Sequence, residues 1–215
     1  MEKKNIHLEN FKEAITSTVR SISEIEDCKV TFGKQTKNTR KSVSLPEVKK
    51  LDSIEDYLIL RANADSGALR LKYSDIEIFN NFKPKGNNAL KLYEIAEKIR
   101  YEKIGSDIFK GIKKNLSHIL ESENSNSSIE NFFEKYLRSS LFNKKEIQKL
   151  DIKTKKLKKT FDAEFKKNLD ELKKNITNQS KFNEIISSVI SKMDIEDKEI
   201  FEESEEKENK KETTS

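Results

Sequence analysis

The residues best suited to chemistry in this sequence are polar and charged side chains that interrupt two otherwise apolar helical stretches. Six of them stand out: Arg61, Asp65, Arg70, Glu97, Arg100 and Glu102. Asp65 follows Arg61 by four residues and Arg100 follows Glu97 by three, spacings that place side chains on one helix face. Buried charges are costly unless they are paired. The spacing therefore predicts two ion pairs that fix how the helices meet, with ordinary surface pairs as the alternative.

Other residue types form no recognisable catalytic, nucleotide-binding or metal-binding motif in this sequence. The sequence contains no phosphate-binding loop, dinucleotide fingerprint, HExxH, CxxC or EF-hand motif. His7 and His118 fall in different helical stretches, and the single cysteine, Cys28, lies in a run of alternating apolar residues. That alternation favours a buried strand position over a reactive thiol. We expect no catalytic centre, no metal site and no cofactor held by this chain.

The elements that must position the six residues are mostly helices. Charged residues make up 38% of the chain and hydrophobic residues 33%, with only five glycines and two prolines. Apolar spacing predicts helices near 6–25, 53–73, 88–120, 129–142, 144–176 and 180–193. Two short strands, 28–32 and 75–82, are predicted to pair, and 33–44 is predicted to be a loop. The expected fold class is mainly α, a multi-helix bundle with a small two-stranded β element.

Local signals refine the helix that carries Arg61, Asp65 and Arg70. Ser53 is a candidate N-cap, with Asp56 three residues later in a capping-box arrangement. Gly67 lies in the middle of this helix, where glycine costs about 1 kcal/mol relative to alanine. We therefore expect Gly67 to mark a close contact with a neighbouring element.

The distribution of charge and polarity suggests how the chain is divided. A polar run, 121–128, is predicted to link an N-terminal helical domain, 1–120, to a helical subdomain, 129–193. From Glu196 to Ser215 nine acidic residues face four lysines, a net charge of −5 in a chain whose total is +5. We expect 194–215 to be a disordered acidic tail. No apolar run reaches the roughly 20 residues that span a bilayer, and a soluble cytoplasmic protein is predicted.

Three ordered segments within about residues 8–120 resemble one protein family. The segment Phe11 to Arg20, followed by Val30-Thr-Phe32, is similar to the opening of CobT proteins. The stretch from Arg61 to Arg70 resembles the family's R-x-x-A-D-x-x-A-L-R helix. The stretch from Glu97 to Gly105 resembles its E-x-x-R-x-E-x-x-G segment.

The resemblance implies a role that composition does not show. CobT-type subunits work with an AAA+ ATPase, CobS, and a large chelatase subunit, CobN, which inserts Co²⁺ into hydrogenobyrinic acid a,c-diamide in aerobic cobalamin synthesis. ATP, Mg²⁺ and Co²⁺ would belong to that whole complex. The family's C-terminal von Willebrand A-type domain carries a D-x-S-x-S motif, which this sequence lacks. We therefore expect the non-catalytic N-terminal region of such a subunit, with the six polar residues as partner contacts.

Two other functions are compatible with the sequence. The basic run 33–41 and the lysines of 144–174 fit a helical nucleic-acid-binding protein. No helix-turn-helix, RRM, KH or zinc-finger pattern supports it, and no aromatic residues are interleaved with the basic run for base stacking. A coiled-coil adaptor is the third possibility, favoured by an apolar stripe from Leu150 to Ile176.

Overall fold

The predicted mainly helical architecture with one two-stranded sheet is confirmed. The computed structural model describes residues 2–33, 40–48, 53–122, 128–142 and 152–193. The helices are α1 (Glu2–Ser23), α2 (Ile54–Tyr73), α3 (Ile76–Asn81), α4 (Asn87–Ile108), α5 (Lys110–Ser122), α6 (Ile129–Leu141), α7 (Ile152–Phe165), α8 (Leu169–Lys174) and α9 (Gln179–Lys192). The strands are β1 (Lys29–Phe32) and β2 (Ser42–Leu45). The predicted tail, 194–215, lies outside the described residues.

The partner of the first strand differs from the prediction. β1 pairs in parallel with β2, in a register that runs from Lys29 opposite Ser42 to Phe32 opposite Leu45. β2 falls at the end of the segment predicted to be a loop. Its alternation is short, because only Val43 and Leu45 are apolar, and both become buried against the helices. Cys28, which directly precedes β1, is fully buried as predicted.

The segment predicted as the second strand is instead helix α3. Its N-cap is Asp75, whose side chain accepts hydrogen bonds from the backbone N–H groups of Glu77 and Ile78. A carboxylate in that position satisfies donors that a helix start leaves without partners. The alternation of Ile76 and Ile78 favours a strand, but the same segment also contains a three-residue spacing typical of a helix. Ile76 and Phe79 lie three residues apart and line the same cleft, which is described below.

Two long predicted helices are divided in the structure. The helix expected over 88–120 ends at Phe109, whose backbone is extended at φ −114° and ψ 102°. Its ring packs with a small core around Leu69 and Ile112, so tertiary packing decides the break. The stretch 144–176 forms α7 and α8, separated by a turn in which the N–H of Asn168 donates to the carbonyl of Phe165. Residues 143–151 lie outside the described part.

Helix α2 confirms both local predictions made for it. Ser53 and Asp56 form a complete capping box, in which each side chain accepts from the other residue's backbone N–H. A Cβ added at Gly67 would lie 2.6 Å from Cγ1 of Val43 in β2. Glycine therefore allows α2 to lie directly against the sheet.

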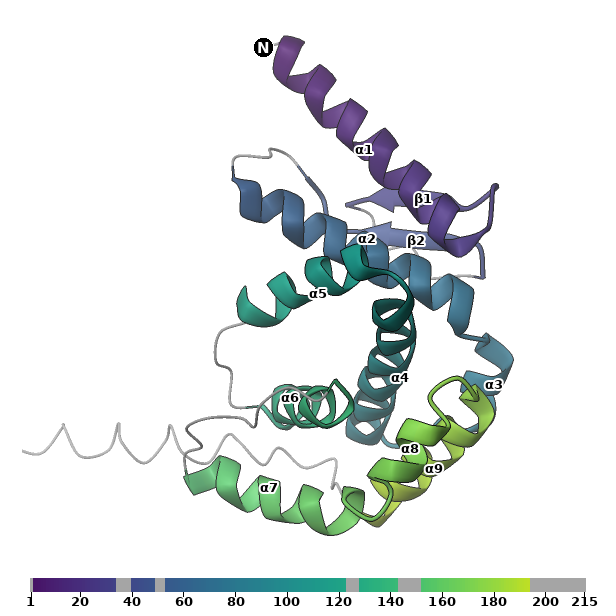
Figure 1. The fold of residues 1–215 in the computed structure, drawn as a ribbon, viewed down its shortest axis with the longest axis vertical. Helices are drawn as coiled ribbons and strands as arrows, with labels where there is room; N and C mark the ends of the chain where they lie inside the picture. The colour runs from purple at the N-terminus through teal and green to yellow at the C-terminus, as the bar shows by residue number, and fades with distance from the viewer. Residues whose placement is uncertain (1, 34–39, 49–52, 123–127, 143–151, 194–215) are drawn as a thin grey trace, which may run out of the picture.

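Helix α4 occupies the middle of the molecule (Figure 1). On one side, α1, α2 and the sheet enclose a core that includes Ile15, Val19, Val43 and Ala64. On the other side, Leu92, Tyr93, Ala96 and Ile99 of α4 share a larger core with α6, α7, α8 and α9. This second core joins residues from before and after the predicted linker 121–128. The proposed division into domains stays a prediction.

Within the described residues, no helix combines the length and the apolar character that a membrane crossing requires. The cytoplasmic location stays a prediction.

Candidate functional site

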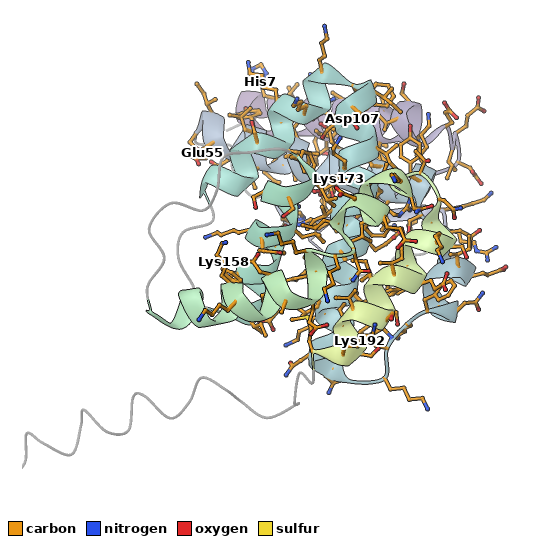
Figure 2. The ribbon with its side chains drawn as sticks, turned by 60° about the horizontal axis from the view of Figure 1, so that its bottom comes forward. His7, Glu55, Asp107, Lys158, Lys173 and Lys192 are labelled. Atoms are coloured by element: carbon orange, nitrogen blue, oxygen red, sulfur yellow. The ribbon has the colours of Figure 1, made fainter. Side chains whose placement is uncertain are left out.

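The six polar residues singled out from the sequence lie on α2 and α4, which pack against each other. Asp65, Glu97, Arg100 and Glu102 are buried, with at most 3% of their surface exposed. Arg61 and Arg70 are partly exposed. The same two helices also carry ordinary surface charges, such as Glu55 and Asp107, which are exposed and labelled in Figure 2. The four buried residues are therefore not part of the solvated charge layer.

Asp65 connects α2 to α5 through its carboxylate. Arg61 donates from Nε to Oδ1 at 2.9 Å, the pair predicted from the four-residue spacing. Asn115 of α5 donates from Nδ2 to Oδ2 at 2.7 Å. Packing of α4 against both α2 and α5 encloses this group. Both carboxylate oxygens of a fully buried aspartate are thus satisfied, which offsets its desolvation.

The second predicted pair, Glu97 with Arg100, is also present and is almost completely buried. Arg100 donates from Nε to Oε2 and from Nη2 to Oε1 of Glu97, both at 2.8 Å. The guanidinium also donates to the backbone carbonyls of Tyr73, at the end of α2, and Ile176, before α9. Ser74 donates to Glu97 Oε1 at 2.6 Å. This fork-shaped pair fastens α4 to two segments far away in the sequence.

The third buried group joins Glu102 to a residue that the sequence did not single out. Ser66 of α2 donates to Oε1 of Glu102, and Arg138 of α6 lies 2.6 Å from Oε2. Arg138 also bonds Glu134 one turn earlier on α6, at 2.7 Å. Burial alone would lower the pKa of Arg138, but Glu102 and Glu134 outweigh it and raise that pKa. The four-residue spacing of Glu134 and Arg138 was the available signal.

A cleft of about 970 Å³ lies beside this network, between α2, α3, α4 and α6. Its apolar wall consists of Leu71, Ile76, Phe79 and Ile95. Charged residues surround that wall, namely Arg40, Arg70, Asp75, Lys91, Glu94, Glu97, Lys98 and Glu130. A volume of this order falls in the range of roughly 300–1,000 Å³ that is typical of binding sites. An apolar wall with a charged rim suits recognition of a partner surface.

Arg70 differs from the other cations of the cleft, because no acidic residue among those that the structure describes pairs with it. Arg40 pairs with Glu77, Lys91 with Glu130 at 3.4 Å, and Lys98 with Glu134 at 3.7 Å. Arg70 donates to the backbone carbonyl of Ser42 at 2.7 Å, and no described carboxylate comes within 4 Å of it. Burial lowers the pKa of its guanidinium, which nevertheless stays charged at neutral pH. The cleft thus contains a partly buried positive charge that an incoming acid can neutralise.

The site as described supports binding. In the part of the chain that the structure covers, no three His, Cys, Asp or Glu side chains gather closely enough to hold a metal ion. The partner contacts predicted for all six residues stay a prediction. Of the six, Arg70 and Glu97 line the cleft, whereas Asp65 and Glu102 are enclosed by neighbouring helices.

Comparison with known proteins identifies the family. No solved structure matches the chain. The family model described as "Cobalamin biosynthesis protein CobT" matches residues 6–215, nearly the whole sequence. That span contains α2, α4 and the three resembling segments, and it extends through the second helical half of the molecule. The chain therefore belongs to the CobT family of cobalamin biosynthesis proteins.

Proposed function

We propose that this chain is the N-terminal assembly module of a CobT-type cobaltochelatase subunit. In this role it supports ATP-dependent insertion of cobalt into hydrogenobyrinic acid a,c-diamide, with an AAA+ ATPase and a large chelatase subunit as partners. Cobalt is the substrate of that complex. The ATPase and the large subunit supply the chemistry, and this chain supplies a docking surface.

The observation that carries the proposal is the family match over residues 6–215. The cleft next to Arg70 supports the proposal as a candidate docking surface for the ATPase partner. Ile76 is 42% exposed there, although it is a large apolar side chain. Arg70 lines the same cleft, and no acidic side chain of the described segments pairs with it. An acidic group and an apolar side chain on the ATPase would complement both features. Such charge complementarity mainly determines which partner is selected.

The geometry determines which substitutions test this proposal. Arg100 is 1% exposed and is bonded to Glu97, so replacing it would destabilise the fold and confound a binding measurement. Arg70→Gln removes the positive charge and keeps an amide that can donate to Ser42. Ile76→Ser removes exposed apolar surface. Arg20→Gln is the matched control, because Arg20 lies on α1, outside the cleft, and also donates to a backbone carbonyl, that of Cys28.

The measurement is co-purification of each variant with a CobS-type ATPase, together with circular dichroism to confirm helicity. We expect wild type and Arg20→Gln to bind equally. Arg70→Gln should lower the affinity by about tenfold, the loss of one charge-assisted hydrogen bond. If wild type binds neither the ATPase nor the large chelatase subunit, the proposed function is wrong. If Arg70→Gln and Ile76→Ser bind like wild type, the docking surface lies elsewhere.

A further inference from the structure

Helix α3 forms one wall of the cleft, although little of its own surface is buried. It lies at the edge of the molecule, between the end of α2 and α9 (Figure 1). Ile78 and Phe79 are half-buried, and its other four residues are exposed. A helix of six residues is too short to be stable in water by itself. Interactions with other elements must therefore fix α3, and with it the positions of Ile76 and Phe79 in the cleft wall.

The start of α3 is held by one side chain of α9. Gln179 accepts a hydrogen bond through Oε1 from the backbone N–H of Asp75, at 2.7 Å. It also donates from Nε2 to the backbone carbonyl of Asp75, at 2.9 Å. One amide thus bonds both backbone groups of the residue that caps α3. Gln179 is only 7% exposed, and a hydrogen bond shielded from water in this way is stronger than one in solvent.

The end of α3 is fixed separately, by α4. The hydroxyl of Tyr93, a fully buried residue, donates to the backbone carbonyl of Phe79 at 2.9 Å, and the two rings lie 4.8 Å apart. By contrast, the pair of Arg40 with Glu77 is exposed on both sides, and such a pair contributes little to stability. Helix α3 is therefore attached to α4 at its end and, at its start, to a glutamine 104 residues further along the chain.

We propose that Gln179 is the positioning residue of the cleft, through which the second helical half of the chain sets the wall that α3 provides. Without these two bonds Asp75 would still cap α3, but the helix would lose its attachment to α9. Ile76 would then no longer be held against the cleft. Helix α9 thus completes the docking surface, although no residue of α9, which the structure describes throughout, lines the cleft. The attachment of α3 is independent of the proposed function, whereas its consequence for docking rests on it.

Hydrogen exchange of the full chain, followed peptide by peptide, tests this attachment. In wild type the amides of α3 should exchange together and faster than those of α4, because few buried contacts must break to open α3. Gln179→Met keeps the length of the side chain and removes both hydrogen bonds. It should speed exchange over 75–82 by at least about tenfold and leave exchange of α4 unchanged. Gln179→Asn, whose amide is too short to make both bonds, should have an intermediate effect.

Asn178→Ala is the matched control. The Asn178 side chain caps α9 by accepting a hydrogen bond from the backbone N–H of Lys181 at 3.1 Å. Its loss weakens the same end of α9 and leaves the bonds between Gln179 and Asp75 in place. Exchange over 75–82 should therefore match wild type in this variant. The proposal is overturned if Asn178→Ala accelerates that exchange as much as Gln179→Met, if neither Gln179 variant accelerates it, or if wild-type α3 is protected as strongly as α4.

Binding of a CobS-type ATPase tests the consequence for docking. Gln179→Met should weaken co-purification severalfold, because α3 no longer presents Ile76 in the cleft wall. Ile76→Ser should then cost less affinity in the Gln179→Met background than in wild type, since coupled residues do not add. Equal losses in the two backgrounds would overturn positioning through α3. If wild type does not bind the ATPase, the proposed function fails, and hydrogen exchange still decides whether Gln179 holds α3.

Discussion

At the scale of single residues, the buried ion pairs hold the helices together. Their contribution to the free energy of unfolding can be measured by removing one partner. Arg100→Met would leave the Glu97 carboxylate buried beside one remaining donor, Ser74. Removing one partner of a buried pair typically costs about 3–5 kcal/mol. We expect a destabilisation of that order in urea unfolding. Lys181→Met is the control, because Lys181 pairs with Glu184 at the same three-residue spacing but in solvent. Its unfolding midpoint should hardly change.

The ion pairs of Glu134 predict how the stability of the protein depends on pH. Burial would raise the pKa of this carboxyl, but Arg138 and Lys98 outweigh burial and hold the pKa below its usual value of 4.5. The ion pairs therefore stabilise the fold fully above that usual value, and the contribution is lost as the pH falls through the folded-state pKa. The stability difference between wild type and Glu134→Gln should thus be largest near neutral pH and shrink below about pH 4.5. Urea unfolding across this range measures it, and a difference that grows in acid would contradict the assignment.

At the scale of elements, two glycines on neighbouring helices should respond in opposite ways to the same substitution. A Cβ at Gly105 of α4 would overlap the side chain of Leu69, which is fully buried on α2. Gly105→Ala should therefore cost roughly 1–3 kcal/mol through overpacking. A Cβ at Gly111 of α5 meets nothing within 4 Å. Gly111→Ala should stabilise the protein by up to about 1 kcal/mol through helix propensity. Thermal unfolding of both variants checks the close approach of α4 and α2.

At the scale of the whole molecule, the shared core predicts that the first helices depend on the last ones. A chain that ends at residue 122 would expose Leu92, Tyr93, Ala96 and Ile99, which are all fully buried in the complete protein. We expect such a chain to lose cooperative unfolding, as measured by circular dichroism. A chain that ends at residue 193 keeps that core and should unfold as the full chain does. Cooperative folding of 1–122 would instead support an independent N-terminal domain.

The sequence by itself determined the features that depend on neighbours along the chain. The capping box at Ser53, the helical periods, and the pairs Arg61–Asp65 and Glu97–Arg100 all follow from spacings of three or four residues. The family resemblance was likewise carried by ordered local segments such as Arg61 to Arg70. The prediction of a strand over 75–82 was wrong because two local signals competed there. Ile76 and Ile78 alternate as in a strand, but Asp75 caps helix α3.

Only the tertiary structure decided which distant residues meet. Glu102 lies 36 residues after Ser66 and 36 residues before Arg138, so no helical spacing predicts that they form one buried group. The choice of β2 as the partner of β1 and the break at Phe109 have the same cause, because both depend on packing against α2. The cleft beside Arg70 also exists only where several helices come together. Hydrophobic burial sets that arrangement without regard to sequence distance, and the buried charges then take the partners that the packing places beside them.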